Sequence, residues 1–328
     1  MTVHAIETRA LSRRFGEKRA VDGIDLEVRR GEIFAVLGPN GAGKTTLVRM
    51  LATLLRPSGG SARVLGHDIE REPREVRRKI SLTGQFASVD EDLTGYENLL
   101  LLSRLSGLKG GEAKARAAGL LGAFDLADSA GKQAKDYSGG MRRKLDIASS
   151  LIRRPELLFL DEPTTGLDPR SRNQVWDIVR GLAASGTTIL LTTQYLEEAD
   201  QLAGEIAVVD HGRIIARGTS AELKAKVGGG VLQISLASAA QREEAGNILS
   251  GTLSGEVRAG GNGVSMSVDV ADPDAGLAAL SALSAAGIVL SGYSLSQPSL
   301  DEVFFALTGR PPEPEAGPET APTPEAAQ

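Results

Sequence analysis

Cysteine is absent from the 328-residue sequence, and this absence excludes disulfide scaffolds, zinc sites built on thiolates and cysteine nucleophiles. An excess of positive charge is also lacking, because 37 basic residues stand against 42 acidic ones and give a net charge of −5. A protein whose main activity is to wrap nucleic acid is therefore disfavoured, and we expect no nucleic-acid partner.

Long hydrophobic runs are missing as well. No stretch approaches the roughly 18 to 20 apolar residues that span a bilayer, and the best contender, residues 276–291, is rich in Ala, Ser and Gly. That composition is more typical of a surface helix that leads into a buried strand. The N-terminal residues lack the basic and then apolar layout of a signal peptide. Any membrane role is therefore expected to depend on a partner.

The composition that remains is globular, with 41% hydrophobic and 24% charged residues, and the chain is long enough for one large core and one smaller unit. We expect an α/β domain over residues 1–226, with a helical subdomain at about 87–150, and a small α+β accessory domain over 231–309. A glycine triplet at 228–230 marks the hinge. Residues 310–328, rich in Pro and Glu, are expected to be a disordered tail.

The expected elements of the first domain follow the order of a parallel sheet. Two short strands are expected to pair, a buried strand leads directly into a helix that ends at Pro57, and later strands are each followed by a helical pattern. The expected strands lie at 5–10, 21–28, 32–37, 157–160 and 188–192, with a hairpin near 61–70. In the second domain, the alternating segments 233–237, 256–260 and 264–270 predict strands, with a helix at 274–286 and a further strand near 288–295.

A phosphate-loop pattern lies between the buried strand and the helix. It consists of Gly38, Pro39, Asn40, Gly41, Ala42, Gly43, Lys44, Thr45 and Thr46. In this position backbone N–H groups and the helix N-terminus surround phosphate oxygens without Cβ atoms in the way. The pattern predicts that Lys44 reaches the β- and γ-phosphates of ATP and that the Thr45 hydroxyl ligates Mg²⁺.

Two carboxylates end the apolar run at 157–160. Asp161 and Glu162 lie at the carboxyl end of a buried strand, the edge at which open α/β sheets present their ligand sites. With a phosphate loop upstream, Asp161 is predicted to orient the metal and Glu162 to polarise the attacking water.

A further motif, Tyr137-Ser138-Gly139-Gly140-Met141, resembles the signature motif of ABC ATPases. It follows the expected helical insertion and precedes the two carboxylates. With phosphate loop, signature and carboxylate strand in this order and spacing, almost the whole chain resembles the ATP-binding subunit of an ABC transporter. The resemblance implies a P-loop NTPase fold and hydrolysis of ATP with Mg²⁺.

The resemblance also implies roles for single residues. Gln85 matches the glutamine that approaches Mg²⁺ and the membrane subunit, Phe15 matches the aromatic that stacks on adenine, and Asp168 matches the motif that communicates across a dimer. The signature motif would contact the γ-phosphate bound to the opposite chain, through Ser138, Gly139 and Gly140. We therefore expect a homodimer at the cytoplasmic face of the membrane, bound peripherally to a separate polytopic permease.

Gln194 departs from the family's pattern. Most ABC ATPases have a histidine after the two threonines that precede this position, whereas the histidines of this chain are His4, His67 and His211. Gln194 can donate a hydrogen bond to the γ-phosphate, but it supplies no positive charge and cannot shuttle a proton. We count it with Glu162 and Lys44 as a catalytic residue and expect slow turnover.

Two further segments resemble the daunorubicin/doxorubicin-resistance group of drug exporters. They are Thr192–Asp200 and Pro298–Phe304, the second of which lies in the small C-terminal domain. The resemblance implies export of a hydrophobic drug or antibiotic-like compound. A lipid or polysaccharide exporter and a soluble, non-transport ABC ATPase remain as alternatives. Leu300, Val303, Phe304 and Leu307 share one helical face, which serves either the small domain's own core or a dimer or regulatory contact.

Overall fold

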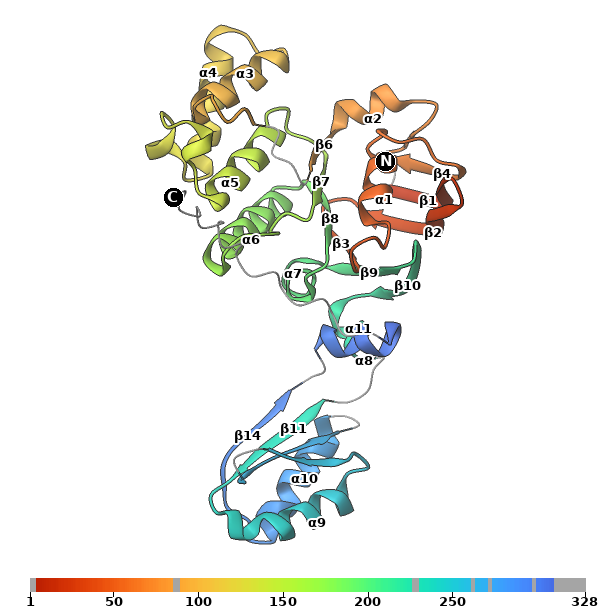
Figure 1. Ribbon diagram of the computed structural model, residues 1–328, viewed down its shortest axis with the longest axis vertical. Helices are drawn as coiled ribbons and strands as arrows, with labels where there is room; N and C mark the ends of the chain where they lie inside the picture. The colour runs from red at the N-terminus through yellow and green to blue at the C-terminus, as the bar shows by residue number, and fades with distance from the viewer. Residues whose placement is uncertain are drawn as a thin grey trace, which may run out of the picture. The chain divides into compact units, whose positions relative to one another are not determined.

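The computed structural model describes residues 4–84, 89–225, 230–260, 263–270, 273–296 and 299–309. They form two compact units, which meet in the sequence at Arg217 and Gly218 (Figure 1). The expected boundary at 226 therefore lies too late, because helix α8 (Ser220–Ala225) packs against α11 (Leu300–Thr308) of the second unit. Gln85, most of the expected glycine hinge and the expected tail at 310–328 lie outside the described residues.

A six-stranded sheet forms the centre of the first unit. Its order is β10-β9-β3-β8-β7-β6, and the pairs β9/β3, β3/β8, β8/β7 and β7/β6 are parallel. β3, β7 and β8 are buried at every residue, as expected for apolar strands covered on both faces. The strands are β3 (Ile33–Leu37), β6 (Ile80–Thr83), β7 (Leu157–Asp161), β8 (Thr188–Thr193), β9 (Glu205–Asp210) and β10 (Arg213–Gly218).

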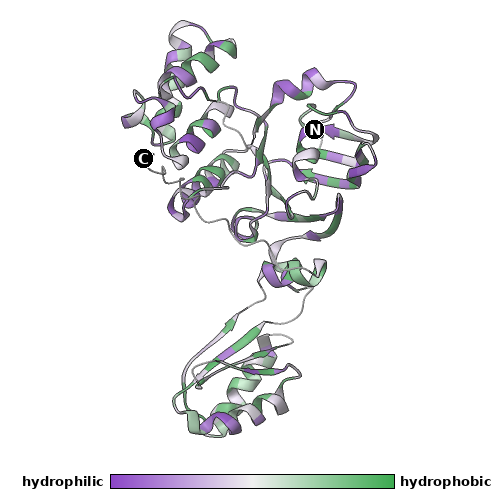
Figure 2. Ribbon diagram, viewed as in Figure 1, coloured by the Kyte–Doolittle hydropathy of each residue, from purple (hydrophilic) through white to green (hydrophobic). Residues whose placement is uncertain are grey.

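A second sheet of the same unit is antiparallel, in the order β2-β1-β4-β5. Alternate residues of β2 are buried, and the hydrophobic and hydrophilic stripes along this sheet in Figure 2 follow the same alternation. Its strands are β1 (His4–Phe15), β2 (Lys18–Arg29), β4 (Gly59–Val64) and β5 (His67–Asp68). The pairing of β1 with β2 and the β4/β5 hairpin agree with the sequence prediction.

The helices of the first unit include the expected helical subdomain. They are α1 (Lys44–Leu51), α2 (Pro73–Lys79), α3 (Gly95–Leu105), α4 (Gly110–Ala123), α5 (Gly139–Ser150), α6 (Pro169–Ala184) and α7 (Leu196–Leu202), with short 3-10 turns at Ala127–Ser129 and Ala134–Asp136. α1 ends before the predicted Pro57, because Thr53 takes a left-handed conformation with φ 62°. Among the described residues, no helix has the length and apolar character that crossing a membrane requires.

The second unit is a small α+β fold. Its antiparallel sheet has the order β12-β13-β11-β14, and its core includes Ile234, Leu249, Val268 and Leu283. Its strands are β11 (Val231–Leu236), β12 (Val257–Ala259), β13 (Ser265–Asp269) and β14 (Leu290–Ser296), and its other helices are α9 (Arg242–Thr252) and α10 (Pro273–Ala285), with a 3-10 turn at Ala239–Gln241.

The apolar face predicted on α11 is mostly buried. Leu300, Val303 and Phe304 are buried, whereas Leu307 remains 39% exposed. The helix contacts α8 within the same unit. Most of its apolar face is therefore buried without a second chain.

Candidate functional site

The phosphate loop connects β3 to α1 through a backbone that only glycine accommodates at two points. Gly43 has φ 106°, and a Cβ there would lie 2.2 Å from the carbonyl oxygen of Ala20. A Cβ on Gly38 would lie 2.2 Å from the carbonyl oxygen of Val209. The Gly38 N–H donates to the Thr193 carbonyl at 3.1 Å. The loop is therefore fixed against three other segments, β2, β8 and β9.

Lys44 begins α1 and turns back over the loop. Its Nζ atom donates to the carbonyl oxygens of Gly38 at 2.7 Å and Pro39 at 3.1 Å, and lies 3.3 Å from Glu162 Oε1. Both charged side chains are almost completely buried, with 4% and 7% of their surface exposed. The structure thus brings together a cation and a carboxylate that are far apart in the sequence.

Asp161 and Glu162 lie at the carboxyl end of β7, beside the phosphate loop. The Asp161 carboxylate accepts hydrogen bonds from the hydroxyls of Thr45 at 3.2 Å and Thr192 at 2.5 Å. Glu162 has a positive φ of 49°, which is rare for a residue with a side chain. Its N–H donates to the Thr192 carbonyl at 3.0 Å, so the neighbouring strand β8 stabilises this turn.

A cavity of about 290 Å³ opens over the loop. Phe15, which is 48% exposed, forms part of its wall. The lining residues are Phe15, Lys18, Ala20, Asn40, Gly41, Gly43, Lys44, Thr45, Thr46 and Glu162. Of the predicted site residues that the structure describes, nine do not line it: Gly38, Pro39 and Ala42 of the loop itself, Asp161, the signature residues Ser138, Gly139 and Gly140, Asp168, and Gln194. Gln85 lies outside the described residues.

The signature residues begin α5. Ser138 is the N-cap residue, and its hydroxyl accepts the Met141 N–H at 3.3 Å. A Cβ on Gly140 would lie 2.5 Å from Ser171 Oγ, so α5 and α6 approach closely here. Asp168 caps α6, and its hydrogen bonds from Ser171 hold the pKa of this carboxyl below its usual range. Ser171 therefore leaves no room for a Cβ at Gly140 beside it and donates its hydrogen bonds to Asp168.

Arg143 was not predicted from the sequence, although it connects α5 to the carboxylate turn. Its guanidinium donates to the carbonyl oxygens of Pro163 at 2.8 Å, Gly84 at 2.9 Å and Asp161 at 3.2 Å. Burial lowers the pKa of this guanidinium, and nearby carboxylates, first among them Asp146, oppose the shift. The one signal in the sequence is the spacing of Arg143 and Asp146, three residues apart on a helix.

Gln194 directly follows β8, next to the strand that leads into the phosphate loop. Its Oε1 atom is buried and accepts no hydrogen bond from the residues that the structure describes. A buried acceptor without a partner is unfavourable, and the described residues supply no donor for this oxygen.

Glu198 on α7 is a buried carboxyl group that was not predicted from the sequence. It is 0% exposed, and its Oε1 accepts hydrogen bonds from Thr164 Oγ1 at 2.8 Å and Trp176 Nε1 at 3.2 Å. Burial raises the pKa of Glu198 above its ordinary value of 4.5, although the hydrogen bonds and the charge of Arg143 oppose the rise. Glu198 therefore ties α7 to the turn after Glu162.

We expect the substitution Glu198→Gln to change how stability depends on pH. Because its folded-state pKa is raised, the stability contributed by protonated Glu198 is fully present below pH 4.5 and is lost as pH rises through the folded-state pKa. Glutamine keeps the Oε1 acceptor and has no charge to bury, so the melting temperature of the variant relative to wild type should increase with pH. Calorimetry at several pH values measures this difference, with Glu197→Gln on the same helix as control. A pH-independent difference would contradict the prediction.

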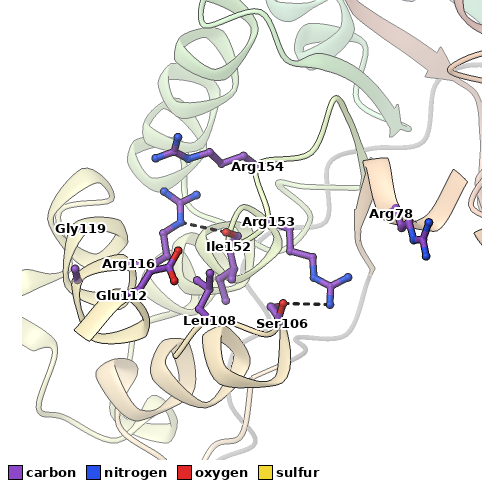
Figure 3. Close-up of a pocket in the computed structure, with 10 residues that line it drawn as sticks. Arg78, Ser106, Leu108, Glu112, Arg116, Gly119, Ile152, Arg153 and Arg154 are labelled. Carbon is purple, nitrogen blue, oxygen red and sulfur yellow. Dashed lines mark hydrogen bonds between the residues drawn. The ribbon is translucent and has the colours of Figure 1, made fainter. Parts of the chain in front are cut away.

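A larger cavity, about 800 Å³, lies in the same unit away from the phosphate loop (Figure 3). Arg116 donates hydrogen bonds to the carbonyls of Leu151 and Ile152 after α5. Burial, and then the charge of Arg154, lowers the pKa of Arg116. The lining residues are Arg78, Ser106, Leu108, Glu112, Ala115, Arg116, Gly119, Ile152, Arg153 and Arg154. Four arginines against one glutamate make this cavity basic.

Comparison with known proteins identifies the family. The family model described as ABC transporter matches residues 21–165. The chain is 57% identical over 307 residues to the daunorubicin/doxorubicin resistance ATP-binding protein of Streptomyces peucetius, covering 94% of this chain and 93% of that protein. It is 45% identical over 301 residues to the doxorubicin resistance ATP-binding protein of Mycobacterium tuberculosis, covering 91% of each.

A solved structure, the ADP conformation of an ATP-binding cassette of an ABC transporter, is 27% identical with a TM-score of 0.61, over 67% of this chain and 93% of that one. The predicted fold class and family are confirmed. The chain belongs to the ATP-hydrolysing, ATP-binding subunits of ABC transporters, in the group of daunorubicin/doxorubicin resistance ATP-binding proteins.

Proposed function

We propose that two copies of this chain work as a homodimer at the cytoplasmic face of the membrane, and that their ATP hydrolysis drives export of a hydrophobic drug through a separate polytopic permease. The observation that carries this proposal is the convergence of Lys44, Thr45, Asp161 and Glu162 on one edge of the sheet, beside the phosphate loop. The drug is inferred from the names of the similar resistance proteins.

Phosphate binding is assigned to the loop and Lys44. The loop's backbone is held by contacts that fix its glycines, and the N-terminus of α1 follows directly, which favours anions. Lys44 Nζ is already held above the Gly38 and Pro39 carbonyls, from where its charge neutralises phosphate oxygens. Phe15, in the wall of the same cavity, offers an aromatic face to the adenine.

Mg²⁺ fits the oxygen donors at the edge of this cavity. Thr45 Oγ1 and Asp161 Oδ1 lie 3.2 Å apart, and Mg²⁺ in nucleotide sites takes hydroxyl, carboxylate, water and phosphate oxygens. Thr45 would hold the ion directly, Asp161 would orient it, and Gln85 is assigned to it by family resemblance. When bound, the ion neutralises charge on the phosphate oxygens.

Glu162 is assigned the role of polarising the attacking water. Its carboxylate is in the wall of the loop cavity and its backbone is held in a left-handed conformation by Thr192. A backbone strained in this way, at a site, aims a side chain that a relaxed turn would direct elsewhere. Arg143 holds the carbonyls on both sides of this residue, and is assigned a positioning role.

Gln194 is proposed to contact the γ-phosphate as a neutral donor. Removing one hydrogen bond to a charged group costs about 1.5 kcal/mol, so Gln194→Ala should lower turnover by roughly tenfold at saturating ATP. Gln194→His should instead make turnover depend on pH near the ordinary imidazole pKa of about 6.5. Steady-state phosphate release measures both. An unchanged rate in Gln194→Ala would show that this side chain does not participate.

The proposed homodimer is supported by the place of the signature residues in a single chain. Ser138, Gly139 and Gly140 do not line the loop cavity of their own chain, whereas the N-terminus of α5 offers backbone N–H groups to an anion. A second copy, arranged symmetrically, would bring its signature to this nucleotide. ATP between the two copies then favours the closed pair, and hydrolysis favours its opening.

The basic cavity of Figure 3 is proposed as a surface for the permease. Arg153 and Arg154 are exposed there, beside the apolar side chains of Leu108 and Ile152. A cytoplasmic segment of the permease that carries acidic side chains complements this charge.

The test combines partner recovery with drug accumulation. Tagged protein is purified in mild detergent from its native cells, and co-purifying proteins are identified by mass spectrometry. Recovery of a polytopic membrane protein, reduced in the charge-reversed pair Arg153→Glu and Arg154→Glu, supports the permease assignment. Recovery with ribosomes or nucleic-acid enzymes alone would contradict it.

Accumulation of doxorubicin in cells that lack the gene tests the transported compound. Wild-type protein should restore efflux and Glu162→Gln should not. Unchanged accumulation despite a recovered permease would overturn drug export and favour a lipid or polysaccharide.

A further inference from the structure

Arg13 lies against the aromatic ring that borders the loop cavity. The two residues are on β1, two positions apart, and the guanidinium carbon of Arg13 lies 4.7 Å from the centroid of the Phe15 ring. This distance is within the range of a cation–π contact, about 6 Å. Phe15 lines the cavity and Arg13 does not. The guanidinium therefore occupies one side of the ring, and the cavity has access to another part of it.

The position of Arg13 is fixed independently of the ring. Its Nη1 donates to the carbonyl oxygen of Arg56 at 2.8 Å, a residue far along the chain. Its Nε is buried and has no hydrogen-bond partner within the described part of the chain. A buried donor without a partner is unfavourable, so the contacts that keep the guanidinium here are the Arg56 carbonyl and the Phe15 ring.

Phe15 lies at the end of a hairpin, and its side chain is half exposed. Gly16 adopts φ 58° and Phe15 pairs with Lys18 on β2 at the end of the hairpin. Phe15 is 48% exposed, although most large apolar side chains of this unit are buried. A half-exposed ring at the end of a hairpin has several rotamers open to it, and the Arg13 guanidinium lies against it in the orientation that the structure shows.

We propose that Arg13 is a positioning residue for the nucleotide base. By covering one face of Phe15, it holds the ring in a single orientation and leaves the opposite face for the adenine. This inference rests on the proposed stacking role of Phe15. Arg13 contributes to the base-dependent part of ATP affinity and leaves the phosphate-dependent part unchanged.

The test separates these two parts by comparing ATP with inorganic tripolyphosphate, each with Mg²⁺, by isothermal titration calorimetry on the full chain. Arg13→Ala is expected to weaken ATP binding by about three- to tenfold, the range of an exposed to partly desolvated cation–π contact. Affinity for tripolyphosphate should stay within about twofold of wild type, which is the range of a surface substitution. Turnover at saturating ATP should also be unchanged, because the reacting groups are not touched.

Three further variants test whether the loss of ATP affinity comes from the contact between Arg13 and the Phe15 ring. Arg13→Lys keeps a cation over the ring and should recover most of the ATP affinity. Arg14→Ala removes the neighbouring charge without a ring contact and should have no effect. In the double variant, Arg13→Ala combined with Phe15→Ala should bind ATP no more weakly than Phe15→Ala alone, since Arg13 acts through the ring.

The outcomes that overturn the inference are distinct. Equal weakening of ATP and tripolyphosphate by Arg13→Ala would indicate a general distortion of the loop, and additive effects in the double variant would show that Arg13 does not act through Phe15. If Phe15→Ala itself leaves ATP affinity unchanged, the stacking role of Phe15 is wrong, and the inference is lost with it. ATP binding by the phosphate loop would stand in each case.

Discussion

Glu162→Gln is expected to bind ATP and to hydrolyse it at least about 100 times more slowly than the wild-type protein, the effect of losing a general base. Glutamine has the same shape as glutamate, so the backbone turn and its hydrogen bonds from Glu162 to Thr192 are retained. The amide cannot accept a proton from water. ATP binding is kept because Lys44 retains its other partners, the carbonyls of Gly38 and Pro39.

Single-turnover phosphate release and equilibrium ATP binding, measured on the same preparation, check this expectation. Size-exclusion chromatography with ATP should show an accumulated dimer, because the closed pair no longer opens by hydrolysis. The matched control is Glu156→Gln, a half-exposed carboxylate just before β7 that pairs with Arg30 and Lys79 at the surface. Full activity of Glu162→Gln would show that another group polarises the water.

The parts of the site that were predicted from the sequence are those whose members are adjacent in the chain. The phosphate loop consists of nine consecutive residues, Gly38–Thr46. The spacing of its glycines, Lys44 and Thr45 is sufficient to predict a phosphate-binding turn. Asp161 and Glu162 follow an apolar run that is recognisable as a buried strand. The parallel order of the strands then places both groups at the same edge of the sheet.

The parts that were missed depend on contacts between distant segments. Arg143 connects the carbonyls of Gly84, Asp161 and Pro163, and its only local signal, the spacing from Asp146, does not reveal these contacts. The same is true of Glu198, whose partners Thr164 and Trp176 come from other segments.

Two boundaries also differ from the prediction. α1 ends at Leu51, before Pro57, because of a local feature, the left-handed conformation of Thr53. The second unit begins at Gly218, because α8 packs with α11 from the end of that unit.

Lys44→Ala is expected to weaken ATP binding by about 30- to 100-fold, which corresponds to about 2 to 3 kcal/mol for a charge-assisted contact with phosphate. Two effects add. The substitution removes the cation that faces the phosphates, and it leaves the Glu162 carboxylate, which lies 3.3 Å from Lys44 Nζ in wild type, in the wall of a cavity that receives a polyanion. Calorimetric titration with ATP and with tripolyphosphate should show the loss for both ligands.

The two effects are separated by the double variant Lys44→Ala with Glu162→Gln. Because the amide carries no charge, this protein should bind ATP roughly tenfold more tightly than Lys44→Ala alone, by removal of one like-charge contact. Lys79→Ala, which removes a surface cation that pairs with Glu156 and does not line this cavity, is the matched control and should keep tripolyphosphate affinity. Equal affinities of the single and double variants would show that Glu162 does not face the phosphates, and would place the water-polarising group elsewhere. Relief by the double variant would show that Lys44 serves both to attract the phosphates and to neutralise the carboxylate that the hydrolytic step requires beside them.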